Sequence, residues 1–113
     1  MTSNTMISIV ILNFNRAKDL LETLSKTKDI KWKNKEIIIV DNGSTDDSVD
    51  QIKKLNDKDY IKVFIKNNRG SAYGHQVGMQ KAKGELIITL DDDAFINPNN
   101  INVCVELFSK FQN

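Results

Sequence analysis

Three consecutive aspartates, Asp91, Asp92 and Asp93, are the residues of this chain best suited to chemistry. They follow the apolar segment 86–90, which is typical of a buried strand, so the chain enters the acidic run in extended form. Because side chains alternate between the faces of a strand, Asp91 and Asp93 are expected on the same side. Two carboxylates about 5 Å apart repel by roughly 3 kcal/mol at an effective dielectric of ~20. A divalent cation removes that repulsion, and oxygen ligands favour Mg²⁺ or Mn²⁺, with phosphate oxygens completing the coordination.

A purely structural role for the three aspartates is the alternative. Acidic residues after a strand are often solvated loop residues or helix N-caps. Pro98 and the apolar positions after it predict that a helix begins nearby. The aspartates alone favour neither interpretation, so the elements that precede them have to separate the two.

Strands and helices alternate along the chain. The predicted strands cover residues 7–12, 36–40, 60–65 and 86–90, and the predicted helices cover residues 17–24, 49–55, 70–82 and 97–111. This order predicts an α/β fold, a three-layer sandwich with a mainly parallel sheet and helices on both faces. The third strand alternates more than the others, which is typical of a strand near the edge of a sheet.

Short polar signals predict where three of the helices begin or end. Asn15 is expected to be the N-cap of the first helix. Ser44, with Asp47 three residues later, resembles a capping box before the second helix. Gly84 is expected to cap the end of the third helix.

The third helix carries a stripe of small residues, because Gly70, Gly74, Gly78 and Ala82 recur every four positions. An interior glycine costs a helix about 1 kcal/mol relative to alanine, so something must approach this stripe closely. Close packing against the sheet and direct contact with a ligand both explain it.

Polar residues follow every predicted strand. In parallel sheets ligands bind outside the carboxyl ends of the strands, where the strand order reverses. We therefore predict a cation-dependent phosphate site at this edge of the sheet. The polar residues that meet there are Asn13 and Asn15, Asp41 and Asn42, Asn67 and Asn68, and Asp91 to Asp93.

Length and charge restrict the class of protein. The chain has 113 residues, which suits one domain or part of one. Sixteen basic and fifteen acidic side chains give a net charge of +1, which does not favour a nucleic-acid binder. Cys104 is the single cysteine and cannot form an internal disulfide. With no apolar run long enough for a signal peptide or a membrane segment, we expect a cytoplasmic protein, or one at the inner face of the membrane in a longer parent.

Several motifs in a fixed order resemble one known family. Segment 8–16 resembles its opening strand and turn, and segment 38–46 resembles its second strand with the acidic turn behind it. Segment 68–78 resembles its Asn-x-Gly and small-residue helix, and Leu90 to Asp93, followed by Pro98, resembles its metal-binding DxD region. Together these motifs resemble the nucleotide-sugar-binding half of a GT-A glycosyltransferase of family 2, whose N-terminal half is Rossmann-like.

The resemblance implies roles for individual residues. The turn from Asn13 to Asn15 lines the nucleotide pocket, and Asp41 accepts a hydrogen bond from the base, commonly uracil. Asp91 lies near the ribose, and Asp93 holds Mg²⁺ or Mn²⁺ against the diphosphate, a good leaving group when bound to metal. The expected nucleotide-binding residues are Asn13, Phe14, Asn15, Asp41, Asn68, Gly70, His75, Asp91 and Asp92, and the expected metal ligands are Asp93 and Asp91.

Two positions depart from the pattern of the family. Leu12-Asn13 stands where many relatives have Pro-Thr, and His75-Gln76 stands where many have Arg-Asn. His75, the only histidine, either touches the nucleotide or faces solvent.

The family continues for roughly another hundred residues, about half a domain on ordinary size ranges. That half carries the acceptor site and the catalytic base, so no catalytic base is assigned here. Residues 1–113 are expected to form a single, partial nucleotide-diphospho-sugar-binding domain. This domain is expected to be the donor-binding portion of an inverting, metal-dependent glycosyltransferase that transfers a sugar from a nucleotide-diphosphate sugar, UDP-linked, to an acceptor. The alternative is a truncated, noncatalytic nucleotide-binding or assembly module.

A homo-oligomer is also expected. In the resembled fold the acidic strand pairs with further strands on its outer side, which this chain does not supply. An unpaired apolar edge is a template for association, so we predict assembly through that edge or through the last helix.

Overall fold

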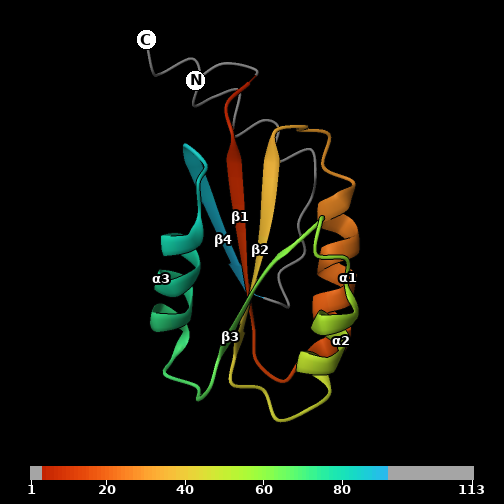
Figure 1. Cartoon of the computed structure of the whole chain (residues 1–113), viewed down its shortest axis with the longest axis vertical. Helices are drawn as coiled ribbons and strands as arrows, with labels where there is room; N and C mark the ends of the chain where they lie inside the picture. Colours follow the sequence, from red (N-terminus) through yellow and green to blue (C-terminus); the bar gives the residue numbers. More distant parts are fainter. Residues whose placement is uncertain (1–3, 92–113) are drawn as a thin grey trace.

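The computed structural model describes residues 4–91, which form a parallel four-stranded sheet with helices on both faces (Figure 1). The elements are β1 (Ile7–Asn13), α1 (Ala17–Lys28), β2 (Lys35–Asn42), α2 (Ser48–Lys54), β3 (Ile61–Ile65), α3 (Ser71–Lys81) and β4 (Leu86–Asp91). The predicted α/β fold is confirmed. The predicted last helix and Cys104 lie outside the described residues.

The strand order in the sheet is β3-β2-β1-β4, and every neighbouring pair is parallel. The third strand is therefore an edge strand, and the acidic strand lies beside the first, as predicted. Ile11 of β1 lies opposite Ile39 of β2 on one side and Leu90 of β4 on the other. Because the chain adds β2 and β3 on one side of β1 and β4 on the other, the strand order reverses between β1 and β4, where open α/β sheets bind ligands.

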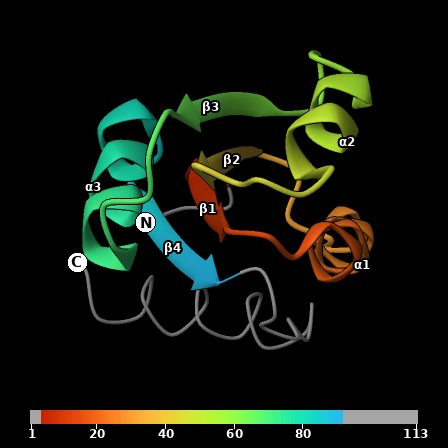
Figure 2. The same ribbon diagram turned by 90° about the horizontal axis from the view of Figure 1, so that it is seen from below.

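Each face of the sheet packs against its own helices, as Figure 2 shows. Along β1, Ile7, Ile9 and Ile11 belong to the core that also contains Leu20 of α1 and Ile52 of α2. The alternate β1 residues Val10 and Leu12 join Ile38 and Val40 of β2 in a second core. The second core packs under α3, which gives the predicted three layers.

The glycine stripe of α3 serves close packing. A Cβ built on Gly74 would lie 2.4 Å from Leu12 Cδ1, and one on Gly78 would lie 2.3 Å from Val10 Cγ1. These two glycines therefore let α3 approach the sheet, as the packing interpretation expects. Gly70 differs, because a Cβ there would meet no atom within 4 Å.

The prediction that Gly84 caps α3 is wrong. The helix ends at Lys81, and Ala82 is its C-cap. Gly84 is needed because it lies against β1, where a Cβ would come within 2.6 Å of Ser8 Oγ. Its N–H donates to Ser8 Oγ at 2.7 Å, and Ser8 in turn donates to Glu36 of β2.

The two predicted helix starts are also wrong. The N-cap of α1 is Arg16 and that of α2 is Asp47, and neither makes a side-chain capping hydrogen bond. Asn15 and Ser44 do not cap because their side chains bond across the carboxyl end of the sheet, as the next section describes.

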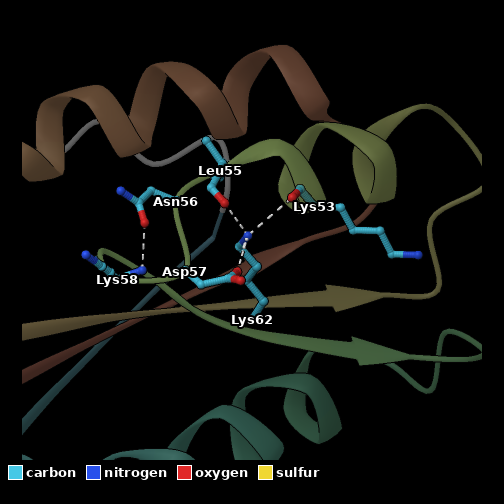
Figure 3. Close-up of polar contacts among 6 residues, drawn as sticks. All are labelled: Lys53, Leu55, Asn56, Asp57, Lys58 and Lys62. Carbon is cyan, nitrogen blue, oxygen red and sulfur yellow. Dashed lines mark hydrogen bonds and ion pairs between the residues drawn. The ribbon is translucent and has the colours of Figure 1, made fainter.

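Lys62 of β3 fixes the end of α2 (Figure 3). Its side chain is only 10% exposed, and its ammonium lies 2.7 Å from Asp57 Oδ1. It also donates to the carbonyl oxygens of Lys53 and Leu55, at the end of the helix. A cation at a helix C-terminus satisfies carbonyls that lack a partner within the helix and interacts favourably with the helix dipole.

Candidate functional site

The carboxyl ends of the strands bring most of the predicted site residues to one edge of the sheet. Asn13 ends β1 and lies opposite Asp41 of β2 in the strand register. The backbone of Asp91 ends β4 on the other side of β1, opposite Leu12. Asn68 follows β3, and its side chain contacts Asn42 at the end of β2. Asp92 and Asp93 lie outside the described residues.

Asp41 is a buried carboxylate, 1% exposed, that neutral groups of the chain surround. Its Oδ1 accepts hydrogen bonds from Asn13 Nδ2 at 3.0 Å and from Ser44 Oγ at 2.6 Å, and its Oδ2 accepts one from the Ser44 N–H at 2.9 Å. A buried charge needs such donors to replace its lost hydration. Asp41 thus holds β1 and the loop after β2 together, and its contact with a base stays a prediction.

Asn15 joins the same two segments from the opposite side. Its Oδ1 accepts the backbone N–H groups of Thr45 at 2.7 Å and of Asp46 at 3.1 Å, and its own N–H donates to Ser44 Oγ. Its φ of 54° lies in the left-handed region, which asparagine tolerates better than most residues. The turn after β1 is therefore fixed to the loop after β2, which is why Asn15 is not available to cap α1.

Asp46 belongs to this pair of loops. Its slight burial would raise the pKa of the carboxyl group, but hydrogen-bond donors outweigh it and hold the pKa below its ordinary value. These donors include the backbone N–H of Ser48, at 2.9 Å, and that of Ala17 at the start of α1. A carboxylate at the first turn of a helix also interacts favourably with the helix dipole.

Asn42 joins the end of β2 to the start of α3. Its Nδ2 donates to Asn68 Oδ1 at 3.2 Å and to the Gly70 carbonyl at 3.1 Å. Asn68 Oδ1 also accepts the N–H of Gly70 at 2.7 Å. Gly70 is the N-cap of α3, with a φ of 92°, a conformation that favours glycine. Two predicted site residues, Asn68 and Gly70, are therefore brought together by Asn42.

Two buried oxygens at this edge lack a hydrogen bond. Within residues 4–91, Asn13 Oδ1 and Asn42 Oδ1 have no partner, although Asn13 is 0% and Asn42 2% exposed. Turning either amide over would place its oxygen against another oxygen, so the present donors fix the orientation. A buried acceptor without a partner costs about 1–3 kcal/mol. Both oxygens are therefore buried acceptors that the described part of the chain leaves without a donor.

Two further predicted residues frame the edge. Phe14 directly follows Asn13 at the end of β1, and its ring is 41% exposed. Such a ring offers a flat apolar surface for stacking. His75 lies on α3 beside Gly74 and is half-buried. Its contact with a nucleotide stays a prediction.

Sequence reasoning missed the roles of Asn42 and Ser44. Asn42 was marked only as a polar residue after a strand, and Ser44 only as a helix cap. The sequence did contain a signal for Asn42: it follows Asp41 at the end of a buried strand, where ligands bind in parallel sheets. Nothing in the sequence indicates that Ser44 would bond to Asp41, because that contact depends on the path of the loop.

The metal site is not tested by the described residues. Between residues 4 and 91, no three His, Cys, Asp or Glu side chains gather closely enough to hold a metal ion. None of the helices in that part of the chain is long and apolar enough to cross a membrane.

Known proteins resemble this chain in sequence and in fold. An uncharacterized glycosyltransferase from Nostoc is 35% identical over 104 residues, which are 90% of this chain and 32% of that protein. The structure of TarS from S. aureus in complex with UDP-GlcNAc has a TM-score of 0.83 at 21% identity, over 93% of this chain and 31% of that one. The mannosyltransferase PcManGT from Pyrobaculum calidifontis, in complex with GDP-Man and Mn²⁺, has a TM-score of 0.81 at 20% identity, over 88% of this chain and 31% of that one.

These comparisons agree on the fold and on the family. The two structures show the GT-A type of α/β fold, and the chain spans about a third of the length of the relatives. Residues 8–113 match the family described as glycosyl transferase family 2. The chain therefore belongs to glycosyl transferase family 2.

Proposed function

We propose that this chain is the donor-binding portion of an inverting, metal-dependent glycosyltransferase, and that its donor is a nucleotide-diphosphate sugar, with uracil as the base. The observation that carries the proposal is the pair of buried acceptors, Asn13 Oδ1 and Asn42 Oδ1, at the carboxyl ends of two neighbouring strands. The complexes of TarS with UDP-GlcNAc and of PcManGT with GDP-Man support a nucleotide sugar as the class of donor.

In this proposal some of the described residues contact the nucleotide, and others hold the contacting side chains in position. Asn13 and Asn42 offer their free oxygens to N–H or O–H donors of the nucleoside, and Phe14 offers a ring for stacking. Asp41 orients the Asn13 amide by accepting its hydrogen bond. Gly70 leaves open space beside its backbone, so a ligand can approach the start of α3 closely.

Asp91 and Asp93, with Asp92 between them, would hold Mg²⁺ or Mn²⁺. Carboxylate oxygens are the ligands that these ions prefer, and Asp91 ends the strand next to β1, at the point where the strand order reverses. A bound cation would neutralise charge on the diphosphate leaving group. The Mn²⁺ bound to PcManGT supports this assignment.

In the proposed reaction, an acceptor hydroxyl attacks the anomeric carbon of the donor sugar from the side opposite the diphosphate. The new carbon–oxygen bond forms as the bond to the diphosphate oxygen breaks, so the configuration inverts and the nucleoside diphosphate leaves. The proton of the hydroxyl passes to a general base, which is not among the residues assigned here.

Calorimetry with UDP and Mn²⁺ tests the proposal. We expect the full chain to bind UDP more tightly than N3-methyl-UDP, because the methyl group removes the N–H that a buried acceptor would receive. Asn42→Ala should lose that preference, and Gln80→Ala, which removes an exposed amide from α3, should keep it. Equal binding of the two ligands by the wild type would contradict the role of Asn42 in reading the base.

A second measurement separates donor binding from transfer. If Asp93→Ala binds UDP as tightly with Mn²⁺ as the wild type does, the metal assignment is wrong. Donor binding without transfer to any acceptor would favour the alternative of a noncatalytic nucleotide-binding module.

A further inference from the structure

One edge of β3 has no partner strand among residues 4–91, because this strand pairs only with β2. In Figure 2, β3 forms one margin of the sheet, with α2 on one side and α3 on the other. An edge strand leaves half of its backbone N–H and C=O groups without partners in the sheet. Such an edge can pair with an additional strand.

A pocket lies on each face of this edge. One, of about 400 Å³, is lined by Val49 and Lys53 of α2 together with Phe64. The other, of about 450 Å³, is lined by Tyr73 and Val77 of α3, again together with Phe64. The side chains of an added strand would point alternately to the two faces, so pockets on both faces suit a peptide better than a ligand that has only one face.

The edge combines apolar and positively charged side chains. Phe64 is 42% exposed, with Lys53 Nζ 5.7 Å from the centre of its ring, and Tyr73 is 37% exposed, with the Arg69 guanidinium 5.2 Å from its ring. Lys66 lines both pockets. Of the described residues that line them, Asp41 is the one acid, and it is buried with its carboxylate hydrogen-bonded. The positive charge of Lys53, Lys66 and Arg69 repels a second copy of the same edge and attracts a negatively charged segment.

Lys62 does not add to this positive charge at the edge. Its ammonium contacts Asp57 and the last carbonyls of α2 (Figure 3). Because the Lys62 side chain is directed to the end of α2, it does not cover the outer edge of β3.

We propose that the edge of β3 binds an extended acidic peptide as an added strand. The peptide carries pairs of adjacent apolar residues, whose two side chains enter the pockets on the two faces, separated by acidic residues, which meet Lys53, Lys66 and Arg69. The exposed backbone of β3 and its apolar side chains distinguish this surface from one that attracts anions by charge alone. Asp41 lines one of the two pockets, so this surface borders the nucleotide-binding residues proposed above.

A titration of the full chain with a defined peptide tests the proposal. The probe is a blocked eight-residue Val-Glu peptide that repeats Val-Val-Glu-Glu, and its binding is followed by NMR of the backbone amides. We expect shifts confined to Val63 through Arg69 and to the facing residues of α2 and α3. The same peptide with alternate nitrogens methylated cannot donate its strand hydrogen bonds, and we expect it to bind at least tenfold more weakly.

Two charge-matched variants show whether the edge itself is responsible. Lys53→Glu/Lys66→Glu should weaken binding of the Val-Glu peptide about tenfold, whereas Lys31→Glu/Lys33→Glu, which changes exposed lysines at the opposite end of the sheet, should change it less than twofold. Equal losses in the two variants, or equal binding of the methylated peptide, would overturn the proposal. Tighter binding of a single-stranded oligonucleotide at the same residues would replace it with a nucleic-acid surface.

Discussion

At the amino end of the sheet Trp32 and Lys35 donate to backbone carbonyls, whereas at the carboxyl end polar side chains bond both to the backbone and to one another. Before β1 and β2, Trp32 Nε1 donates to the Thr5 carbonyl at 2.8 Å, and Lys35 Nζ donates to the carbonyls of Ile30 and Trp32 at 3.0 and 2.9 Å. At the other end, Asn13 bonds to Asp41, and both Asn13 and Asn42 keep a free oxygen.

This difference distinguishes buried polar side chains that only stabilise the fold from those that leave an acceptor for a ligand. Bonds to the backbone at the amino end satisfy the chain's own carbonyls and leave those donors no role beyond stability. The network at the carboxyl end is fixed by the chain but incomplete, and an incomplete network costs stability unless a ligand completes it. Substitutions at the two ends of the sheet test this contrast.

Asp41→Ala should have the largest effect on stability. It leaves the side chain of Asn13 and two donors of Ser44 without their acceptor, so we expect a loss of about 2–4 kcal/mol in the free energy of unfolding. Urea denaturation of the full chain measures it. A loss below about 1 kcal/mol would mean that the carboxylate does not hold the two strands' ends together.

Lys35→Met tests the amino end. The change removes two hydrogen bonds to carbonyls while keeping the apolar stem, and should lower the free energy of unfolding by about 1–2 kcal/mol. Binding of UDP should stay within about twofold of the wild type, because the residue lies at the opposite end of the sheet. A large loss of UDP binding would show that the two ends of the sheet are coupled and that the amino-end hydrogen bonds do not serve stability alone.

Asn13→Val should separate function from stability. Its loss of the hydrogen bond to Asp41 is offset by removal of a buried oxygen without a partner, so we expect a stability change below about 1 kcal/mol. UDP binding should fall about tenfold or more, because one acceptor of the proposed site is gone. Urea denaturation and calorimetry on one preparation measure both quantities. A loss of stability above about 2 kcal/mol would show that the oxygen is already satisfied in the folded chain.

The architecture could be predicted from the sequence because its signals are local. Buried strands such as residues 36–40 show as continuous β-branched runs, and the alternation of strand 60–65 marked it as the edge that β3 occupies. The convergence of Asn13, Asp41 and Asn68 followed from the parallel order of the strands alone.

Helix capping and the hydrogen-bond network could not be predicted in the same way. Asn15 and Ser44 are residue types that often cap helices. Asn15 instead bonds to residues 29 to 31 positions away, and Ser44 bonds to Asn13, Asn15 and Asp41. Local propensity cannot show such competition, because it depends on how loops from different strands meet. Gly84 likewise looks like a cap until Ser8 of β1 is placed against it.

Asp46→Asn should have the smallest effect, and it appears only in acid. Because donors around Asp46 hold the pKa of its carboxyl group below the ordinary value of 3.8, folding favours the charged form. The stability that this adds is present above the ordinary pKa and is lost as the pH falls through the lower, folded value. The urea midpoints of the wild type and of Asp46→Asn should therefore differ by a constant amount near neutral pH and converge below about pH 4. If the Asp46 difference stays constant down to pH 2, the donors at Ala17 and Ser48 do not act on this carboxylate, and the loops at the carboxyl end are joined without it by the hydrogen bonds of Asn13, Asn15 and Asp41.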